Sequence, residues 1–243
     1  MLGIIGAGNM AGALARGWGD PVLASDRGSG RAAALVAEVG GEALRGNAEV
    51  AERADAILLG HKPYQVQPIA REIEAHTAGK TVISVLGGVT VDQLQALYPQ
   101  AAVVRTMPNT PVAIRQGVTC IAEGGESAVE LFERVGKVFV LPEAQIDAAS
   151  TAMGVTPAYL ALVAEALVDA AVYAGVPADK ASGMVAQTMA GTAGLLLERD
   201  GDTLGVRREV TSPGGSTARG LQALDAAGLR QAFQDAAQAV LKR

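Results

Sequence analysis

The sequence is poor in the residues that build metal sites and disulfides. It contains one cysteine, Cys120, and two histidines, His61 and His76, among 243 residues. A single cysteine cannot form an internal disulfide, which favours a reducing compartment. No His–Asp or Cys–His constellation is evident, so we expect no metal site and no catalysis by such a pair.

The sequence also lacks clustered positive charge and aromatic residues. Its net charge is −5, and no run of Lys or Arg stands out, which argues against nucleic acid or an anionic membrane as the partner. Aromatic residues make up only 3%, while Ala, Gly, Leu and Val dominate, as in tightly packed helices. We therefore expect a small molecule as the binding partner.

Segments that would direct the chain to a membrane are not apparent. The first residues read Met-Leu-Gly-Ile-Ile-Gly without a preceding basic region, which predicts a buried strand rather than a signal peptide. The longest apolar segment, residues 158–176, is interrupted by Glu165 and Asp169, which a membrane span would normally exclude. We expect a cytoplasmic protein.

Residues 1–148 alternate short apolar runs with segments of helical spacing. Continuously apolar runs are typical of strands buried on both faces of a parallel sheet. The alternation predicts a doubly wound α/β domain of the Rossmann type. The predicted strands cover residues 2–6, 22–25, 56–60, 81–85 and 102–106, with 118–122 and 138–141 as further candidates, and helices cover 31–39, 69–75 and 91–97.

Residues 149–243 predict an all-helical domain. Residues 157–174 and 177–199 are apolar nearly all round, and such helices must be buried on every side. In a chain of this size a partner subunit is the expected cover. Two shorter helices, over 216–227 and 229–242, complete the domain, and we expect a continuous helix to join the domains near residue 150.

A glycine-rich turn follows the first predicted strand and opens a helix. It reads Gly6-Ala7-Gly8-Asn9-Met10-Ala11, the G-x-G-x-x-A form of the dinucleotide fingerprint. The glycines permit a tight turn and close approach of the pyrophosphate, while the helix N-terminus offers N–H groups to the phosphates. The pattern predicts dinucleotide binding; the alternative is a glycine turn without a ligand.

The second predicted strand ends at Ser25-Asp26-Arg27. An acidic residue at this distance from the turn usually holds the ribose 2′-hydroxyl of NAD, whereas an arginine pairs with the 2′-phosphate of NADP. Ser25, Arg27 and Arg31 together favour NADPH, and Asp26 leaves NADH open.

A second loop, Thr211-Ser212-Pro213-Gly214-Gly215-Ser216-Thr217, precedes a predicted helix. Its glycines expose backbone N–H groups, and the helix dipole adds partial positive charge, so the loop can hold a small carboxylate without an arginine. Ser212, Ser216 and Thr217 can donate further hydrogen bonds. The alternative is a simple capped helix, with Gly215 or Ser216 as the cap.

These motifs, in their order and spacing, resemble the pyrroline-5-carboxylate reductases along essentially the whole chain. The resemblance is carried by the two loops above and by Lys62-Pro63, Gly88-Val89-Thr90, Arg105-Thr106-Met107-Pro108-Asn109-Thr110-Pro111, Pro157-Ala158-Tyr159 and Gly175-Val176-Pro177.

The resemblance implies hydride transfer from NADPH to the cyclic imine 1-pyrroline-5-carboxylate, giving L-proline. It implies a Rossmann domain followed by a helical domain through which the chain forms a homodimer or a ring of dimers. The loop at Ser212, Gly214, Gly215, Ser216 and Thr217 would hold the substrate, and Thr217 would contact the ring nitrogen. The cofactor residues it implies beside the glycine turn are Asn47, Lys62, Pro63 and Asn109.

The sequence departs from the family's pattern at three places. Met153-Gly154-Val155-Thr156 replaces a turn rich in serine and glycine, His61 stands where valine is usual, and Arg208 replaces an acidic residue. These changes leave open a reductase of another small cyclic imine, or a non-catalytic NADP-binding paralogue with a regulatory role. A β-hydroxy-acid dehydrogenase is disfavoured, because Lys180 reads as a solvated residue in a first helical turn.

Overall fold

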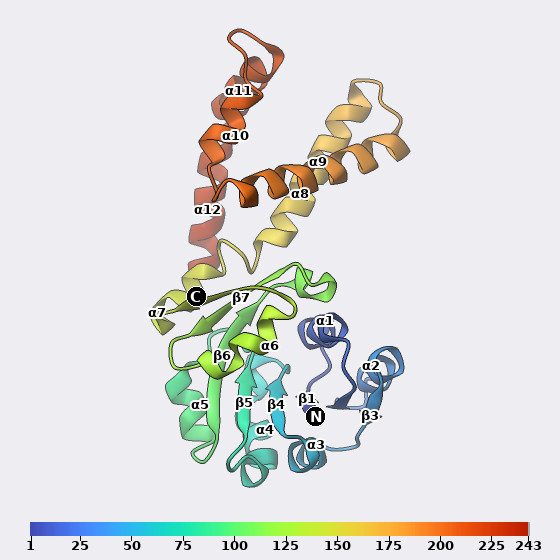
Figure 1. Ribbon diagram of the computed structural model, residues 1–243, viewed down its shortest axis with the longest axis vertical. Helices are drawn as coiled ribbons and strands as arrows, with labels where there is room; N and C mark the ends of the chain where they lie inside the picture. The colour runs from blue at the N-terminus through green and yellow to red at the C-terminus, as the bar shows by residue number, and fades with distance from the viewer. Residues whose placement is uncertain (243) are drawn as a thin grey trace. The chain divides into compact units, whose positions relative to one another are not determined.

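The computed structural model describes residues 1–242. By its contacts the chain divides into two compact units, Met1–Pro157 and Ala158–Arg243, and this boundary lies nine residues beyond the one expected between 148 and 149. Unit 1 carries the sheet and unit 2 is helical, so the predicted fold class is confirmed (Figure 1).

Unit 1 is built on an eight-stranded sheet of order β3-β2-β1-β4-β5-β6-β7-β8. The pairings from β3 through β6 are parallel, β7 runs antiparallel to β6, and β8 is parallel to β7. Both candidate strands thus extend the sheet, in the opposite direction to the first six. The strands are β1 Leu2–Ile5, β2 Val22–Ser25, β3 Gly41–Ala43, β4 Ala56–Leu59, β5 Thr81–Ser84, β6 Ala102–Pro108, β7 Gly117–Ala122 and β8 Gly136–Leu141.

Helices cover both faces of this sheet. Alternate strand residues point to opposite faces, so Ile4 and Leu58 enter one core while Ile5 and Leu59 enter the other. The first core receives residues of α1, α2 and α6, and the second receives residues of α3, α4 and α5. The helices are α1 Asn9–Trp18, α2 Arg31–Val39, α3 Asn47–Arg53, α4 Val66–Ile73, α5 Val91–Leu97, α6 Val129–Glu133 and α7 Glu143–Ala149, with short 3₁₀ turns η1 Pro63–Gln65, η2 Glu74–His76, η3 Thr110–Ile114 and η4 Glu126–Ala128.

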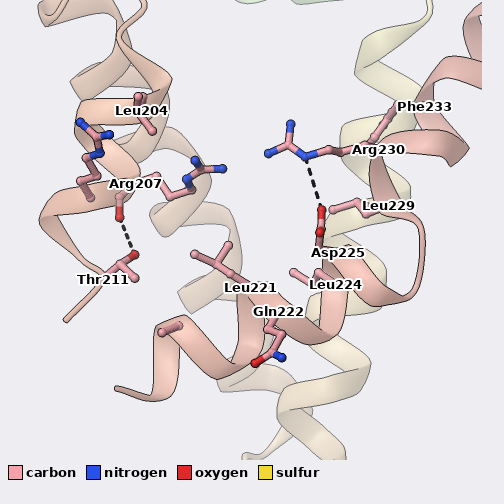
Figure 2. Close-up of a pocket in the computed structure, with 12 residues that line it drawn as sticks. Leu204, Arg207, Thr211, Leu221, Gln222, Leu224, Asp225, Leu229, Arg230 and Phe233 are labelled. Carbon is pink, nitrogen blue, oxygen red and sulfur yellow. Dashed lines mark hydrogen bonds and ion pairs between the residues drawn. The ribbon is translucent and has the colours of Figure 1, made fainter. Parts of the chain in front are cut away.

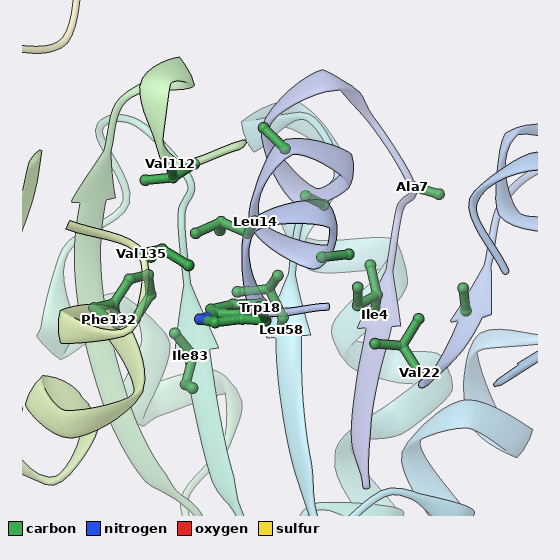
Figure 3. Close-up of a cluster of buried hydrophobic side chains, with 14 of the residues drawn as sticks. Ile4, Ala7, Leu14, Trp18, Val22, Leu58, Ile83, Val112, Phe132 and Val135 are labelled. Atoms are coloured by element: carbon green, nitrogen blue, oxygen red, sulfur yellow. The ribbon is translucent and has the colours of Figure 1, made fainter. Parts of the chain in front are cut away.

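Trp18 anchors the C-terminal end of α1 in the first core (Figure 3). Its ring meets Phe132 edge-on with the centroids 5.7 Å apart, and its Nε1 donates to the Leu131 carbonyl over 2.9 Å. Gly17 allows α1 to approach η3 directly, because a Cβ there would collide with the Val112 carbonyl. The helix that begins at the glycine turn is therefore rigidly seated.

A buried arginine fixes α7 against the sheet. Arg105 is 3% exposed and pairs with Glu143 at 3.0 Å and Asp147 at 2.8 Å. Beside them, Cys120, Ile146 and Met153 belong to a third apolar cluster. Burial raises the pKa of the Cys120 thiol.

The predicted continuous helix near residue 150 is wrong. Helix α7 ends at Ala149, and the N–H groups of Gly154 and Val155 both donate to the Ser150 carbonyl before α8 begins at Thr156. Pro157 is the second residue of α8, a position where proline is tolerated, whereas inside a longer helix it would break the hydrogen-bond ladder.

Unit 2 consists of helices whose apolar side chains lack cover. None of the described residues of α8 is buried, and only Ala181 is buried in α9. Leu197, for example, is 83% exposed. The helices are α8 Thr156–Tyr173, α9 Ala178–Glu198, α10 Thr203–Glu209, α11 Ser216–Ala226 and α12 Leu229–Leu241, of which α10 was not predicted.

Candidate functional site

The glycine turn has the geometry of a phosphate-binding loop. Gly6 adopts φ +92°, and its N–H donates to the Ser25 carbonyl over 3.0 Å. A Cβ at Gly6 would lie 2.6 Å from the backbone nitrogen of His61, so a larger residue cannot stand there. Helix α1 starts at Asn9, which leaves its first N–H groups without intrahelical acceptors. The turn can therefore receive an anion at its backbone.

Close packing of small residues holds this turn against β4. A Cβ on Gly60 would lie 2.6 Å from both the Cβ of Ala11 and the Gly6 carbonyl oxygen. Ala11 is fully buried, and Met10 packs against the first core, so both shape the turn from behind. Gly60 was not identified as a site residue from the sequence, although a glycine at the end of a buried strand indicates close approach of another backbone.

A crevice of about 260 Å³ opens at the carboxyl ends of β1, β2 and β4. This is the switch point of the strand order, where ligands bind in doubly wound sheets. Of the residues predicted to meet the cofactor, it brings together Gly6, Gly8, Asp26, Arg27, Arg31, Asn47 and Lys62, and it adds Ser29, His61, Tyr64, Gln65 and Ile69. Asn9 lies in an adjoining hollow with Arg31.

The carboxylate of Asp26 is fully occupied by its own loop. Oδ1 accepts from the N–H groups of Gly28 and Ser29 at 2.6 and 3.0 Å, and Oδ2 accepts from Ser29 Oγ and Ala32 N at 3.0 and 2.8 Å. A carboxylate has about four acceptor positions, and all are filled. Burial opposes ionisation, but these hydrogen bonds outweigh it and hold the pKa of Asp26 below its usual value. Asp26 thus organises residues 26–32.

Three cations of the crevice carry unneutralised charge. The side chains of Arg27, Arg31 and Lys62 are exposed and, within residues 1–242, make no ion pair or hydrogen bond. The crevice is therefore positive although the chain as a whole carries a net charge of −5. Such a local excess attracts a phosphorylated ligand.

Two predicted cofactor residues point into the protein instead of the crevice. Ser25 is fully buried, and its hydroxyl donates to Asn47 Oδ1 over 2.8 Å. Asn109 is 6% exposed, donates to the Met153 carbonyl over 3.0 Å and accepts from Val118 N over 2.8 Å. Both side chains therefore join segments of unit 1 that are distant in sequence. Pro63 begins η1 beside the crevice without lining it.

His61 combines a bonded and an unbonded ring nitrogen. Nδ1 lies 2.9 Å from the Lys62 carbonyl, so it carries the proton, while Nε2 is buried without a partner among the described residues. The pKa of His61 is lowered, chiefly by burial and also by the positive charge of Arg27. The hydrogen bond to the Lys62 carbonyl raises it in part. The imidazole is therefore neutral at pH 7.

In the loop before α11 the Gly215 N–H is not free, because it donates to the Ser212 carbonyl over 3.0 Å. Gly214 adopts φ +66°, and Gly215 is the N-cap of α11 without a side-chain cap, one of the two caps named by the capped-helix alternative. The hydroxyls of Ser212, Ser216 and Thr217 make no hydrogen bond to any residue from 1 to 242, and the Gly214 carbonyl accepts from Arg219 over 2.7 Å. The N–H groups in the first turn of α11, which lack intrahelical acceptors, and the three free hydroxyls thus gather at one helix start.

A groove of about 790 Å³ lies among α10, α11 and α12 (Figure 2). Its apolar lining comprises Leu204, Leu221, Leu224, Leu229 and Phe233. Arg230 lies 3.5 Å from Asp225, and the Thr211 hydroxyl donates to the Arg207 carbonyl over 2.6 Å. The groove adjoins the loop through Thr211 and Ala218.

Comparison with known proteins identifies relatives of both units. Residues 143–243 match the family model "Pyrroline-5-carboxylate reductase dimerisation", and residues 1–88 match "NADP oxidoreductase coenzyme F420-dependent". The chain is 32% identical to the pyrroline-5-carboxylate reductase of Pisum sativum, over 100% of this chain and 94% of that one. It is 35% identical to the reductase of Synechocystis, over 81% of this chain and 76% of that one.

Solved structures agree. The pyrroline-5-carboxylate reductase of Coxiella burnetii superposes with a TM-score of 0.85 at 29% identity, over 98% of this chain and 95% of that one. The Plasmodium falciparum pyrroline carboxylate reductase, solved with NADP bound, has the same fold, with a TM-score of 0.88 at 24% identity, over 98% and 94% of the two chains. These relatives confirm the resemblance drawn from the motifs: the chain belongs to the pyrroline-5-carboxylate reductase family.

Proposed function

We propose that this protein reduces 1-pyrroline-5-carboxylate to L-proline with NADPH. The observation that carries the proposal is the positive crevice at the switch point, in which a glycine turn and three unpaired cations converge. The membership of the chain in an oxidoreductase family supports the same chemistry. When bound, NADPH supplies the hydride from its nicotinamide ring.

The residues of unit 1 fit this cofactor. The backbone at Gly6 and Gly8 and the start of α1 would hold the pyrophosphate, where a helix N-terminus favours negative charge. Arg27 and Arg31 would pair with the 2′-phosphate, because guanidinium groups match phosphate oxygens. Asp26 cannot readily accept from a ribose 2′-hydroxyl, since donors of its own loop fill its oxygens. This arrangement favours NADPH over NADH.

The loop at residues 212–217 would hold the substrate. Its free N–H groups and the hydroxyls of Ser212 and Ser216 would bind the carboxylate, and Thr217 would hydrogen-bond the ring nitrogen. A threonine hydroxyl is a poor acid, so Thr217 would orient the imine rather than protonate it. The protein's part in the reaction is then to position an already electrophilic carbon and to exclude water.

The apolar helices of unit 2 would be covered by a second copy of the chain. The match to a dimerisation family supports oligomerisation through this unit, and the exposed faces of α8 and α9 supply the area. In the described chain α8 alone is long and apolar enough to cross a membrane, but Glu165 and Asp169 within it make lipid a poor cover. We propose a homodimer or a ring of dimers, located in the cytoplasm.

The test is oxidation of NADPH by the purified protein with 1-pyrroline-5-carboxylate, with proline identified as the product. Thr217→Ala should lower kcat/KM roughly 10- to 100-fold, the value of a lost hydrogen bond to a charged group, and Thr217→Ser should restore most of it. Binding of NADPH without turnover would favour the non-catalytic paralogue. Faster reduction of another small cyclic imine would show that 1-pyrroline-5-carboxylate is not the preferred substrate.

A further inference from the structure

Tyr64 is an exposed aromatic residue at the edge of a charged crevice. It is 81% exposed, the highest value among the exposed large apolar residues of unit 1. It lines the crevice together with Arg27, Arg31 and Ile69. Neither the glycine turn nor the resemblance to the family assigned it a role. The exposed ring is therefore available to a ligand bound in the crevice.

The backbone under Tyr64 is held firmly. Pro63 occupies the first position of η1, Gln65 N donates to the Lys62 carbonyl over 2.9 Å, and Gln65 Oε1 accepts from Lys62 N over 3.0 Å. Helix α4 follows at once and buries Ile69 and Ile73 in the second core. The ring is thus presented from a rigid base, and a ligand that stacks on it has little chain entropy to overcome.

The place of the ring in the crevice indicates which part of a dinucleotide it meets. Tyr64 follows β4, while Arg27 and Arg31 follow β2, and both segments line the same hollow. In NADPH the 2′-phosphate sits on the ribose that carries the adenine. A phosphate held by the arginines therefore brings the base into this hollow. Tyr64 and Ile69 are its aromatic and aliphatic surfaces, and they suit the flat face of a purine.

We propose that Tyr64 stacks on the adenine base of the bound dinucleotide. This inference rests on the proposed binding of NADPH and deepens it by assigning the part of the crevice that receives the base. Stacking of an aromatic side chain on a base contributes about 1–3 kcal/mol, which is roughly 5- to 150-fold in affinity. The contribution depends on the ring and not on the hydroxyl.

The first test measures dissociation constants by calorimetry for NADPH and for adenosine 2′,5′-bisphosphate. Tyr64→Ala should raise both about tenfold, and Tyr64→Phe should leave both within about twofold of the wild type. Dissociation constants that Tyr64→Ala leaves unchanged would overturn the inference without contradicting the proposed binding of NADPH. If the wild type binds neither ligand, the proposed function and this inference fail together.

The second test asks whether the base lies on the ring. The chain has four tyrosines, so ¹⁹F NMR of protein containing 3-fluorotyrosine gives few signals, and Tyr64→Phe identifies the one from Tyr64. Adenosine 2′,5′-bisphosphate should shift that signal, and ribose 5-phosphate, which lacks the base, should not. Tyr173, which is 96% exposed in unit 2, is the matched control. Equal shifts at both tyrosines, or none at Tyr64, would overturn the inference.

Discussion

Replacing Asp26 with alanine tests whether this carboxylate belongs to the loop or to the cofactor. The variant removes four hydrogen bonds, two of them from the N–H groups of Gly28 and Ser29 and one from Ala32 in the first turn of α2. Loss of such a capping carboxylate costs about 1–2 kcal/mol. The midpoint of thermal unfolding should therefore fall by roughly 2–8 °C.

The effect on NADH separates the two roles. If Asp26 held the ribose 2′-hydroxyl, the variant would lose a charged hydrogen bond and raise the dissociation constant of NADH roughly 10- to 150-fold. Because the oxygens are already filled, we expect a change below about threefold. NADPH is less informative, since removal of a negative charge and loosening of the loop act in opposite directions. The assay is calorimetric titration, with Asp26→Asn as the matched control, and a tenfold loss of NADH affinity would refute the reasoning.

Two further residues give distinct predictions. Arg27→Ala should raise the KM for NADPH about tenfold and that for NADH less than twofold, because only NADPH offers a 2′-phosphate to the exposed guanidinium; equal effects on both would contradict this role. His61→Val should raise the free energy of unfolding by about 1 kcal/mol at pH 7, because it removes a buried nitrogen without a partner. The pKa of His61 in the folded chain lies below its ordinary value of 6.5, so the unfolded chain takes up a proton first and the wild type loses stability as pH falls through this region. Urea unfolding at pH 7 and pH 5 should therefore show that the valine variant exceeds the wild type in stability by more at the lower pH. The same difference between the two midpoints at both pH values would count against this account of His61.

Strands and helices that bury a continuous or periodic apolar pattern were predictable from the sequence. Helices α2 and α5 begin and end where the spacing placed them, and five strands lie within a residue or two of expectation. Strand β3 was missed because its three residues are exposed and carry no apolar pattern. Helix α3 was missed because it buries only Val50 and Ala51 over seven residues. Such short elements are fixed by tertiary contacts rather than by their own periodicity.

The glycine turn and the residues after β2 that line the crevice were predictable from the sequence, and Asn47 and Lys62 followed from the family resemblance. Gly6 and Gly8 were identified because a phosphate turn needs glycine there. The roles of Ser25 and Asn109 depend on partners distant in sequence, since Asn109 bonds Met153, 44 positions away. Met153, which departs from the serine- and glycine-rich turn of the family, packs in the third apolar cluster. Tyr64 carries no motif, and its relevance emerges only when the carboxyl ends of β2 and β4 are seen to share a hollow.

The burial of Cys120 makes the native chain a ready background for site-directed labelling. The only thiol is 3% exposed, and its raised pKa keeps the reactive thiolate scarce near neutral pH. A cysteine introduced at any exposed position would then be the one site that a maleimide dye or a spin label modifies. A label in unit 1 combined with one in unit 2 would allow the separation of the two units to be measured with and without NADPH, without first removing a native cysteine.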